Sequence, residues 1–174
     1  MLYNSLSYLV MIYLFEVLKG SQAQAILEQC GYGILNGFFS TFLAMGLLPI
    51  FEYLFDITTD VTLLELSDLN RPVLKRLALE APGTYHHSIV VGNLAEAAAK
   101  ALNANPLLAR VGAYYHDIGK IEKPEYFVEN QMGAKSKHEK LSPSMSALIL
   151  ESHVKEGAEL AQKEHLPKKL TDLI

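Results

Sequence analysis

A long uncharged segment constrains the fold of this 174-residue chain more than any other feature. Between Gln29 and Phe51 the only ionisable side chains are those of Cys30 and Tyr32. A membrane-spanning helix needs about 20 consecutive apolar residues. The glycines of the segment suit close helix packing in lipid. We therefore predict a spanning helix over roughly 31–55; the alternative is a buried helix of a soluble protein.

Residues 1–15 form a second apolar run that carries no charge. The run is shorter than a bilayer span requires. It also lacks the basic start and the cleavage site of a signal peptide. We interpret it as the trailing part of a transmembrane helix, joined by a polar connection at 16–28 to the next. Residues 1–58 are thus predicted to be a helical hairpin at the end of a transmembrane bundle.

Residues 59–174 are predicted to be helical, without a convincing strand pattern. Apolar residues follow a helical period between 61 and 79, and Arg71-Pro72 divides that segment into two short helices. Asn105-Pro106 and Ser142-Pro143 each read as an N-cap followed by proline in the first turn. The further helices are predicted over about 88–102, 105–117, 142–153 and 155–164, with a last one from 166. Residues 120–141 are predicted to be mostly loop.

Charge and cysteine content exclude some classes of protein. The net charge is -4 and the chain has no block rich in lysine and arginine, which argues against DNA or RNA polymers as partners. The single cysteine, Cys30, rules out an intramolecular disulfide bond.

Residues 114–120 read YYHDIGK and predict a metal site. His116 and Asp117 supply an imidazole and a carboxylate, and Lys120 can neutralise an anionic substrate. The pair alone is a common pattern, but His87 and His153 lie in two other predicted elements. We expect each ligand at a helix terminus, facing a space between helices. A carboxylate such as that of Asp117 can also bridge two metal ions.

The remaining histidines are given other roles. His86 points away from its neighbour His87 on a helix, so we expect it outside the ligand set or facing substrate. His138 and His165 are predicted to be surface or hydrogen-bonded residues.

Several longer blocks carry a family resemblance. They read LLELS at 63–67, EAPGTYHHS at 80–88, VGNLAE at 91–96, NPLLARVGAYYHDIGK at 105–120 and SALILESHV at 146–154. These blocks resemble the HD superfamily of metal-dependent phosphohydrolases. More narrowly, they are similar to the bacterial seven-transmembrane HD-domain phosphodiesterases that hydrolyse cyclic di-AMP. The apolar segment ending in Leu47-Leu48-Pro49 resembles the last membrane helix of that family.

The resemblance implies a dinuclear site. His87, His116, Asp117 and His153 would bind two divalent transition-metal ions, iron or manganese, with Asp117 bridging them. Asp117 and Lys120 would be catalytic, and Lys120, together with His86, would contact the substrate. The implied reaction is attack of a metal-bridging hydroxide on phosphorus, which opens cyclic di-AMP to linear pApA.

The family has a His-His pair and an aspartate beyond the position that corresponds to Ile174. We therefore expect an all-α chain truncated at both ends, with an incomplete HD-type helical bundle over 59–174, an incomplete second metal site and impaired activity. The alternatives are another HD nucleotide phosphohydrolase, for example one acting on a guanosine polyphosphate, and a non-catalytic membrane protein that senses nucleotide.

The resemblance also implies a location. The substrate is a cytoplasmic messenger, so we expect a multi-pass protein of the cell membrane with its HD domain in the cytoplasm. Arg71, Lys75 and Arg76 follow the predicted span within about 20 residues, in line with a positive-inside bias. The expected partners are the lipid bilayer and a cyclic dinucleotide, and a homo-oligomer is compatible with the sequence.

Overall fold

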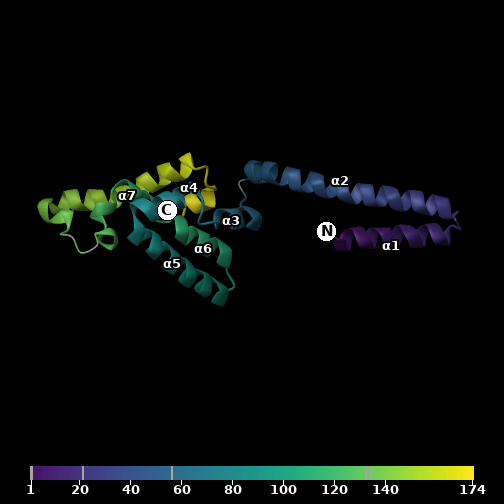
Figure 1. Cartoon of the computed structure of the whole chain (residues 1–174), viewed down its shortest axis with the longest axis horizontal. Helices are drawn as coiled ribbons and strands as arrows, with labels where there is room; N and C mark the ends of the chain where they lie inside the picture. Colours follow the sequence, from purple (N-terminus) through teal and green to yellow (C-terminus); the bar gives the residue numbers. More distant parts are fainter. Residues whose placement is uncertain (1, 21, 56, 132, 134) are drawn as a thin grey trace. The chain divides into compact units, whose positions relative to one another are not determined.

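The computed structural model describes residues 2–20, 22–55, 57–131, 133 and 135–174. Over these residues the chain is helical and has no strand, so the predicted all-α class is confirmed. The chain divides into two compact units, residues 1–57 and 58–174 (Figure 1).

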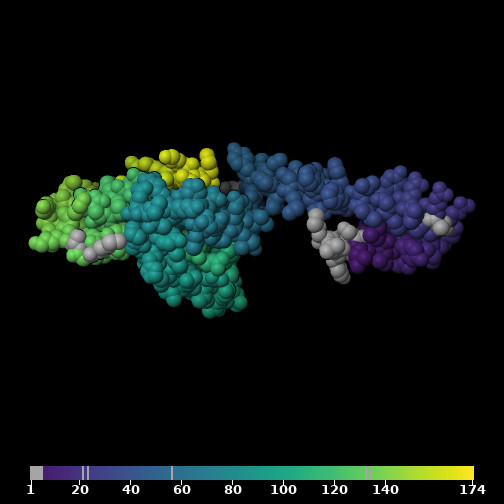
Figure 2. All heavy atoms as spheres, viewed as in Figure 1, coloured from purple at the N-terminus to yellow at the C-terminus, as the bar shows by residue number. Residues whose placement is uncertain are grey.

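The first unit is a hairpin of α1 (Leu2–Leu18) and α2 (Ala23–Phe55). The helices approach closely at Gly33, where a Cβ atom would lie 2.9 Å from Ile12 Cδ1. The space-filling view shows a narrow two-helix unit, purple to blue in Figure 2. Two helices cannot bury their large side chains, and Phe38 is 75% exposed.

The stretch Gln24–Phe55 is long and apolar enough to cross a membrane, judged by length and composition alone. The helix starts earlier than predicted, at Ala23, and α1 extends to Leu18. The predicted polar connection at 16–28 was therefore too long, because glutamine and glutamate are good helix formers that continue α2 toward its N-terminus.

The second unit has six α-helices among its described residues, joined by 3₁₀ turns. The helices are α3 (Asp60–Leu66), α4 (Pro72–Glu80), α5 (Pro82–Ala101), α6 (Pro106–Tyr115), α7 (Pro143–Lys163) and α8 (Lys168–Thr171). The turns are η1 (Ile118–Glu122), η2 (Pro124–Tyr126), η3 (Val128–Asn130) and η4 (Lys137–Lys140).

The predicted helix starts at Asn105 and Ser142 are confirmed by their caps. Asn105 Oδ1 accepts a hydrogen bond from Leu108 N at 2.9 Å, and Ser142 Oγ accepts one from Met145 N at 3.3 Å. The predicted break between α3 and α4 is also present.

Two helix boundaries differ from the prediction, and both concern histidines. α5 begins at Pro82, so His87 lies inside the helix rather than before it. α7 is one continuous helix, so His153 lies in its middle rather than at a terminus. Gly157 lies within α7, and a Cβ atom there would lie 3.3 Å from the backbone nitrogen of Gly119 of η1.

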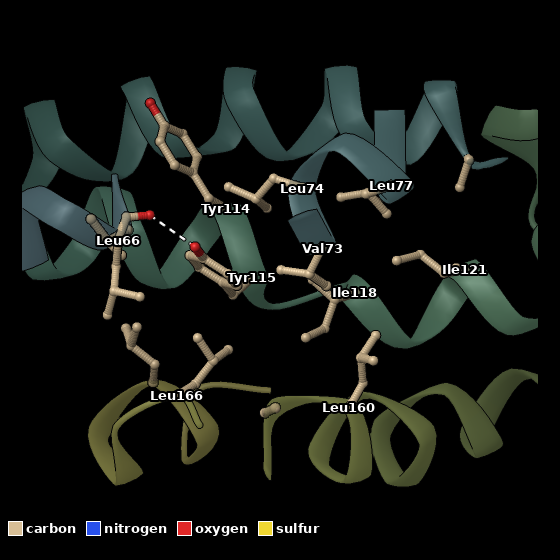
Figure 3. Close-up of a cluster of buried hydrophobic side chains, with 14 of the residues drawn as sticks. Leu66, Val73, Leu74, Leu77, Tyr114, Tyr115, Ile118, Ile121, Leu160 and Leu166 are labelled. Atoms are coloured by element: carbon tan, nitrogen blue, oxygen red, sulfur yellow. Dashed lines mark hydrogen bonds between the residues drawn. The ribbon is translucent and has the colours of Figure 1, made fainter. Parts of the chain in front are cut away.

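The core of the second unit lies where α4, α6, η1 and α7 meet. Leu74, Leu77, Tyr115, Ile118 and Leu160 are buried there (Figure 3). The hydroxyl of Tyr115 donates a hydrogen bond to the backbone oxygen of Leu66 at 2.9 Å, which ties α6 to α3. Burial of this hydroxyl raises the pKa of Tyr115 to about 12. The C-terminal end of α6 is thus fixed by the core.

Candidate metal centre

The His116-Asp117 pair follows directly after α6. His116 is the C-cap residue of that helix, and Asp117 precedes η1. Tyr115 and Ile118 on either side are fully buried, which anchors the pair to the core. The Asp117 side chain is itself only 7% exposed, so its carboxylate requires partners for its charge.

His87, His116 and Asp117 form a cluster in which one ligand atom from each residue lies within 4.8 Å of the others. The ring centroids of His87 and His116 are 5.6 Å apart. Donor atoms bound to one ion at ~2.1 Å lie roughly 3 to 3.5 Å from one another. The observed spacing therefore fits a metal ion after small movements of the side chains.

The two oxygens of Asp117 face two different imidazoles. His116 Nε2 lies 3.2 Å from Asp117 Oδ2, and His153 Nε2 lies 3.6 Å from Asp117 Oδ1. A carboxylate with a nitrogen donor beside each oxygen has the donor arrangement expected for a ligand between two ions. The structure thus brings His87, His116 and His153 around Asp117. His153 reaches this place from the middle of α7, contrary to the predicted helix end.

Backbone oxygens set the orientation of two of these rings. His116 Nδ1 lies 2.8 Å from the oxygen of Ala113, and His153 Nδ1 contacts the oxygen of Leu150. A carbonyl oxygen only accepts hydrogen bonds, so Nδ1 carries the hydrogen in each ring. Nε2 is then the nitrogen left to bind a metal ion in each ring, and backbone partners of this kind are usual for histidines that bind metal.

Lys120 adds a positive charge to the cluster. Its Nζ lies 2.8 Å from Asp117 Oδ2 and 2.8 Å from Glu129 Oε1. Burial alone would raise the pKa of Asp117, but hydrogen bonds from His116 and Lys120 outweigh it and lower that pKa to about 2. Burial likewise opposes the charge of Lys120, but the two carboxylates raise its pKa. The carboxylate and the ammonium are therefore both charged at neutral pH.

The same hydrogen bond acts on His116. Its contact with Asp117 raises the pKa of His116, against the opposing effect of burial. In the metal-free protein the ring and the carboxylate form an ion pair when the ring is protonated. A metal ion binding at Nε2 would have to displace that proton.

The other three histidines lie outside this cluster. His86 is exposed on α5 and is not part of it. His138 Nε2 lies 2.9 Å from the backbone oxygen of Tyr126, which confirms the prediction of a hydrogen-bonded residue. His165 is exposed just beyond the end of α7, as expected for a surface residue.

Sequence reasoning missed Glu129, Phe127 and the close-packing role of Gly119. Glu129 forms an ion pair with Lys120. The rings of Phe127 and His153 lie edge to face, with their centroids 5.6 Å apart. Gly119 allows η1 to contact α7, since a Cβ there would lie 1.9 Å from the oxygen of His153. Neither Glu129 nor Phe127 belongs to a recognisable motif, but the Gly119 of HDIGK could have been read as a close-packing position.

Comparison with known proteins gives the relationships of the chain. Residues 84–174 match the family model of the HD domain. Residues 1–59 match the family model described as a 7TM receptor with intracellular HD hydrolase.

Two curated relatives are cyclic-di-AMP phosphodiesterases named PgpH. The chain is 51% identical over 141 residues to the Bacillus subtilis protein, covering 81% of this chain and 20% of that one. It is 48% identical over 143 residues to the Listeria monocytogenes protein, covering 82% and 20%. The chain therefore spans about one fifth of the length of these relatives.

Two solved structures are also similar, both of the HD domain of L. monocytogenes PgpH. One matches with a TM-score of 0.58 and 51% identity, over 59% of this chain and 50% of that chain. The other, a complex with cyclic-di-AMP, matches with a TM-score of 0.58 and 50% identity, over 61% and 50%.

Proposed function

Because this chain belongs to the HD-domain family, we propose that it is a membrane-tethered, metal-dependent phosphodiesterase that hydrolyses cyclic di-AMP to linear pApA. The observation that carries the proposal is the placement of His116 Nε2 and His153 Nε2 beside the two oxygens of Asp117. The identity of about half with the PgpH phosphodiesterases supports the substrate.

In this proposal His87, His116 and Asp117 hold a first ion, and Asp117 and His153 contribute to a second. The donor set of imidazoles and a carboxylate suits iron or manganese. When bound, the ions would make water a nucleophile at neutral pH and neutralise charge on the phosphoryl oxygens.

The residues of the chain prepare the site for an anionic substrate. Asp117 stays ionised because its pKa is lowered to about 2. The Lys120 ammonium, beside that carboxylate, can donate a hydrogen bond to a phosphate oxygen. The reaction forms a bond from a water oxygen to phosphorus and breaks the P–O3′ bond. The 3′ oxygen takes up a proton, and the second phosphodiester remains intact in pApA.

We further propose that the chain is part of a multi-pass protein of the cell membrane with its HD domain in the cytoplasm. The match of residues 1–59 to the seven-transmembrane family supports this location, as does the apolar stretch Gln24–Phe55. Cyclic dinucleotides are cytoplasmic messengers, so the hydrolytic site belongs on that side.

A hydrolysis assay tests the function. The full chain, purified in detergent and supplied with Mn²⁺, should convert cyclic di-AMP to pApA, slowly in keeping with the impaired activity expected from the sequence, and liquid chromatography would separate the product. His116→Ala should lose bound metal and activity together. Conversion of a guanosine polyphosphate instead would favour another HD hydrolase. Nucleotide binding without metal or turnover would favour a sensor.

A further inference from the structure

Glu129 makes contacts that link Lys120 to α5. Its Oε1 accepts hydrogen bonds from Lys120 Nζ at 2.8 Å and from Thr84 Oγ1 at 3.1 Å. Thr84 is fully buried on α5, one turn before His87. A single carboxylate oxygen thus connects the lysine beside Asp117 with the helix that carries His87.

The fold holds Glu129 in place independently of Lys120. The neighbouring Asn130 binds Thr84 twice: its Oδ1 accepts from the backbone N of Thr84 at 3.0 Å, and its Nδ2 donates to Oγ1 at 2.9 Å. The N-cap residue of α5, Ala81, makes no side-chain cap, so Asn130 satisfies a backbone donor that the helix start leaves open. A Cβ on Gly83 would lie 1.9 Å from the oxygen of Glu129, so the two backbones are in contact.

The charges around Lys120 indicate what its contact with Glu129 does. The ammonium is shared between Asp117 and Glu129 at equal distances of 2.8 Å. Metal ions that use the oxygens of Asp117 would take away one of these counterions and would repel the ammonium. Glu129 then provides a carboxylate for Lys120 that the ions do not need. Without Glu129, the ammonium would compete with the ions for Asp117.

We propose that Glu129 is a positioning residue, which holds Lys120 beside the metal centre and keeps it from occupying Asp117. This inference rests on the proposed metal-dependent function of the same site. Glu129 acts through Lys120 and does not itself bind metal or substrate.

A double-mutant cycle on Mn²⁺ binding tests the proposal. The full chain in detergent would be titrated with Mn²⁺ by calorimetry, as wild type, Glu129→Gln, Lys120→Met and the double variant. Glu129→Gln should weaken binding by roughly tenfold or more, the size expected when a group supporting the ligands is lost. In the Lys120→Met background the same change should have less than about a threefold effect, because no ammonium competes there. An equal loss in both backgrounds would overturn the proposal.

Asn130→Ala is the matched control. It removes the contacts that cap α5 but leaves Glu129 its own bonds to Lys120 and Thr84 and its backbone contact with Gly83. It should lower the melting temperature and leave Mn²⁺ affinity within about threefold of wild type, a ratio that corresponds to about 0.7 kcal/mol. A loss of affinity as large as that of Glu129→Gln would mean that Glu129 acts only through the contacts between η3 and α5 and not through Lys120, which contradicts the proposal.

The same four proteins separate this inference from the proposed function. Wild-type protein that binds Mn²⁺ with the expected coupling but does not hydrolyse cyclic di-AMP would refute the phosphodiesterase and support the role of Glu129. Hydrolysis by wild type together with additive effects on Mn²⁺ binding would refute the role of Glu129 alone.

Discussion

Gly119 and His153 are in direct backbone contact. A Cβ atom on Gly119 would lie 1.9 Å from the backbone oxygen of His153 and 2.5 Å from the backbone nitrogen of Gly157. Gly119 follows Asp117 by two positions, so this contact fixes the separation of the Asp117 carboxylate from the His153 ring. The register of α7 against η1 is therefore part of the site.

Gly119→Ala should separate η1 from α7, because neither backbone can yield as a flexible side chain would. We expect a loss of about 2–3 kcal/mol in unfolding free energy, at the upper end for overpacked sites. Denaturant unfolding measures this loss, and metal analysis should show reduced Mn²⁺ content.

Gly112→Ala is the control for that change. A Cβ there meets the Cδ1 atom of Leu173, at the end of a flexible side chain. We expect a smaller loss of stability and wild-type metal content. Equal effects of the two alanines would contradict the close-packing role of Gly119.

The contrast between α6 and α5 shows what the sequence could predict. Asn105 caps its own helix by accepting a hydrogen bond from the backbone N of Leu108, three residues on, so the start of α6 can be predicted from neighbouring residues. The cap of α5 comes from Asn130, 46 positions from Thr84. Rules that read neighbouring residues cannot find such a partner, and the predicted α-helix began too late as a result.

The same limit applies to the site. The HD motif and the histidine blocks predicted His87, His116, Asp117 and His153 as ligands, because their resemblance to a family is local in sequence. Glu129 depends on the path of the chain through η2 and η3, which has no helical period to predict it. The close approach of Gly157 in α7 to the backbone of Gly119 likewise joins residues far apart in the sequence.

Tyr115→Phe should destabilise the second unit. It removes the hydroxyl that donates to the backbone oxygen of Leu66 within the core. The buried acceptor would lose its partner, at a cost of about 1–2 kcal/mol. Thermal unfolding should show a melting temperature lower by several degrees, on the order of 4–8 °C per kcal/mol for a unit of this size.

Tyr85→Phe serves as the reference for that measurement. Tyr85 is half-buried on α5, and its hydroxyl makes no hydrogen bond among the described residues. Its loss should change the melting temperature by little. If the two variants have the same melting temperature, the hydrogen bond from Tyr115 to Leu66 contributes nothing measurable to stability.

The stability of the metal-free protein should be greatest at mildly acidic pH and should fall when the pH is lowered or raised from there. The pKa of Asp117 is lowered to about 2 in the folded state, so its contribution is complete above the unfolded value near 3.9 and is lost as pH falls toward 2. The shift corresponds to about 2.5 kcal/mol. The pKa of His116 is raised, so its contribution is complete below about 6.5 and is lost as pH rises through the folded value.

Unfolding in denaturant with a chelator, over a pH series, measures both limbs. Asp117→Asn removes the carboxylate and should flatten the curve on each side, because His116 loses its ion-pair partner as well. Added Mn²⁺ should stabilise wild type most at neutral pH, where the ions compete least with protons. An Asp117→Asn curve that follows wild type would show that the ion pair does not set this pH dependence.

The ends of α2 should lie on opposite sides of the membrane. The apolar stretch Gln24–Phe55 has 32 residues, and at 1.5 Å per residue such a helix exceeds the ~30 Å hydrocarbon core of a bilayer. In a Cys30→Ser background, single cysteines at Lys19 and Val61 would mark the two ends. A membrane-impermeant maleimide added to intact cells should label Lys19→Cys at once and Val61→Cys only after permeabilisation, since the HD unit is proposed to be cytoplasmic. Equal labelling of both positions would show that α2 does not span, and the reverse pattern would place the HD unit outside the cell.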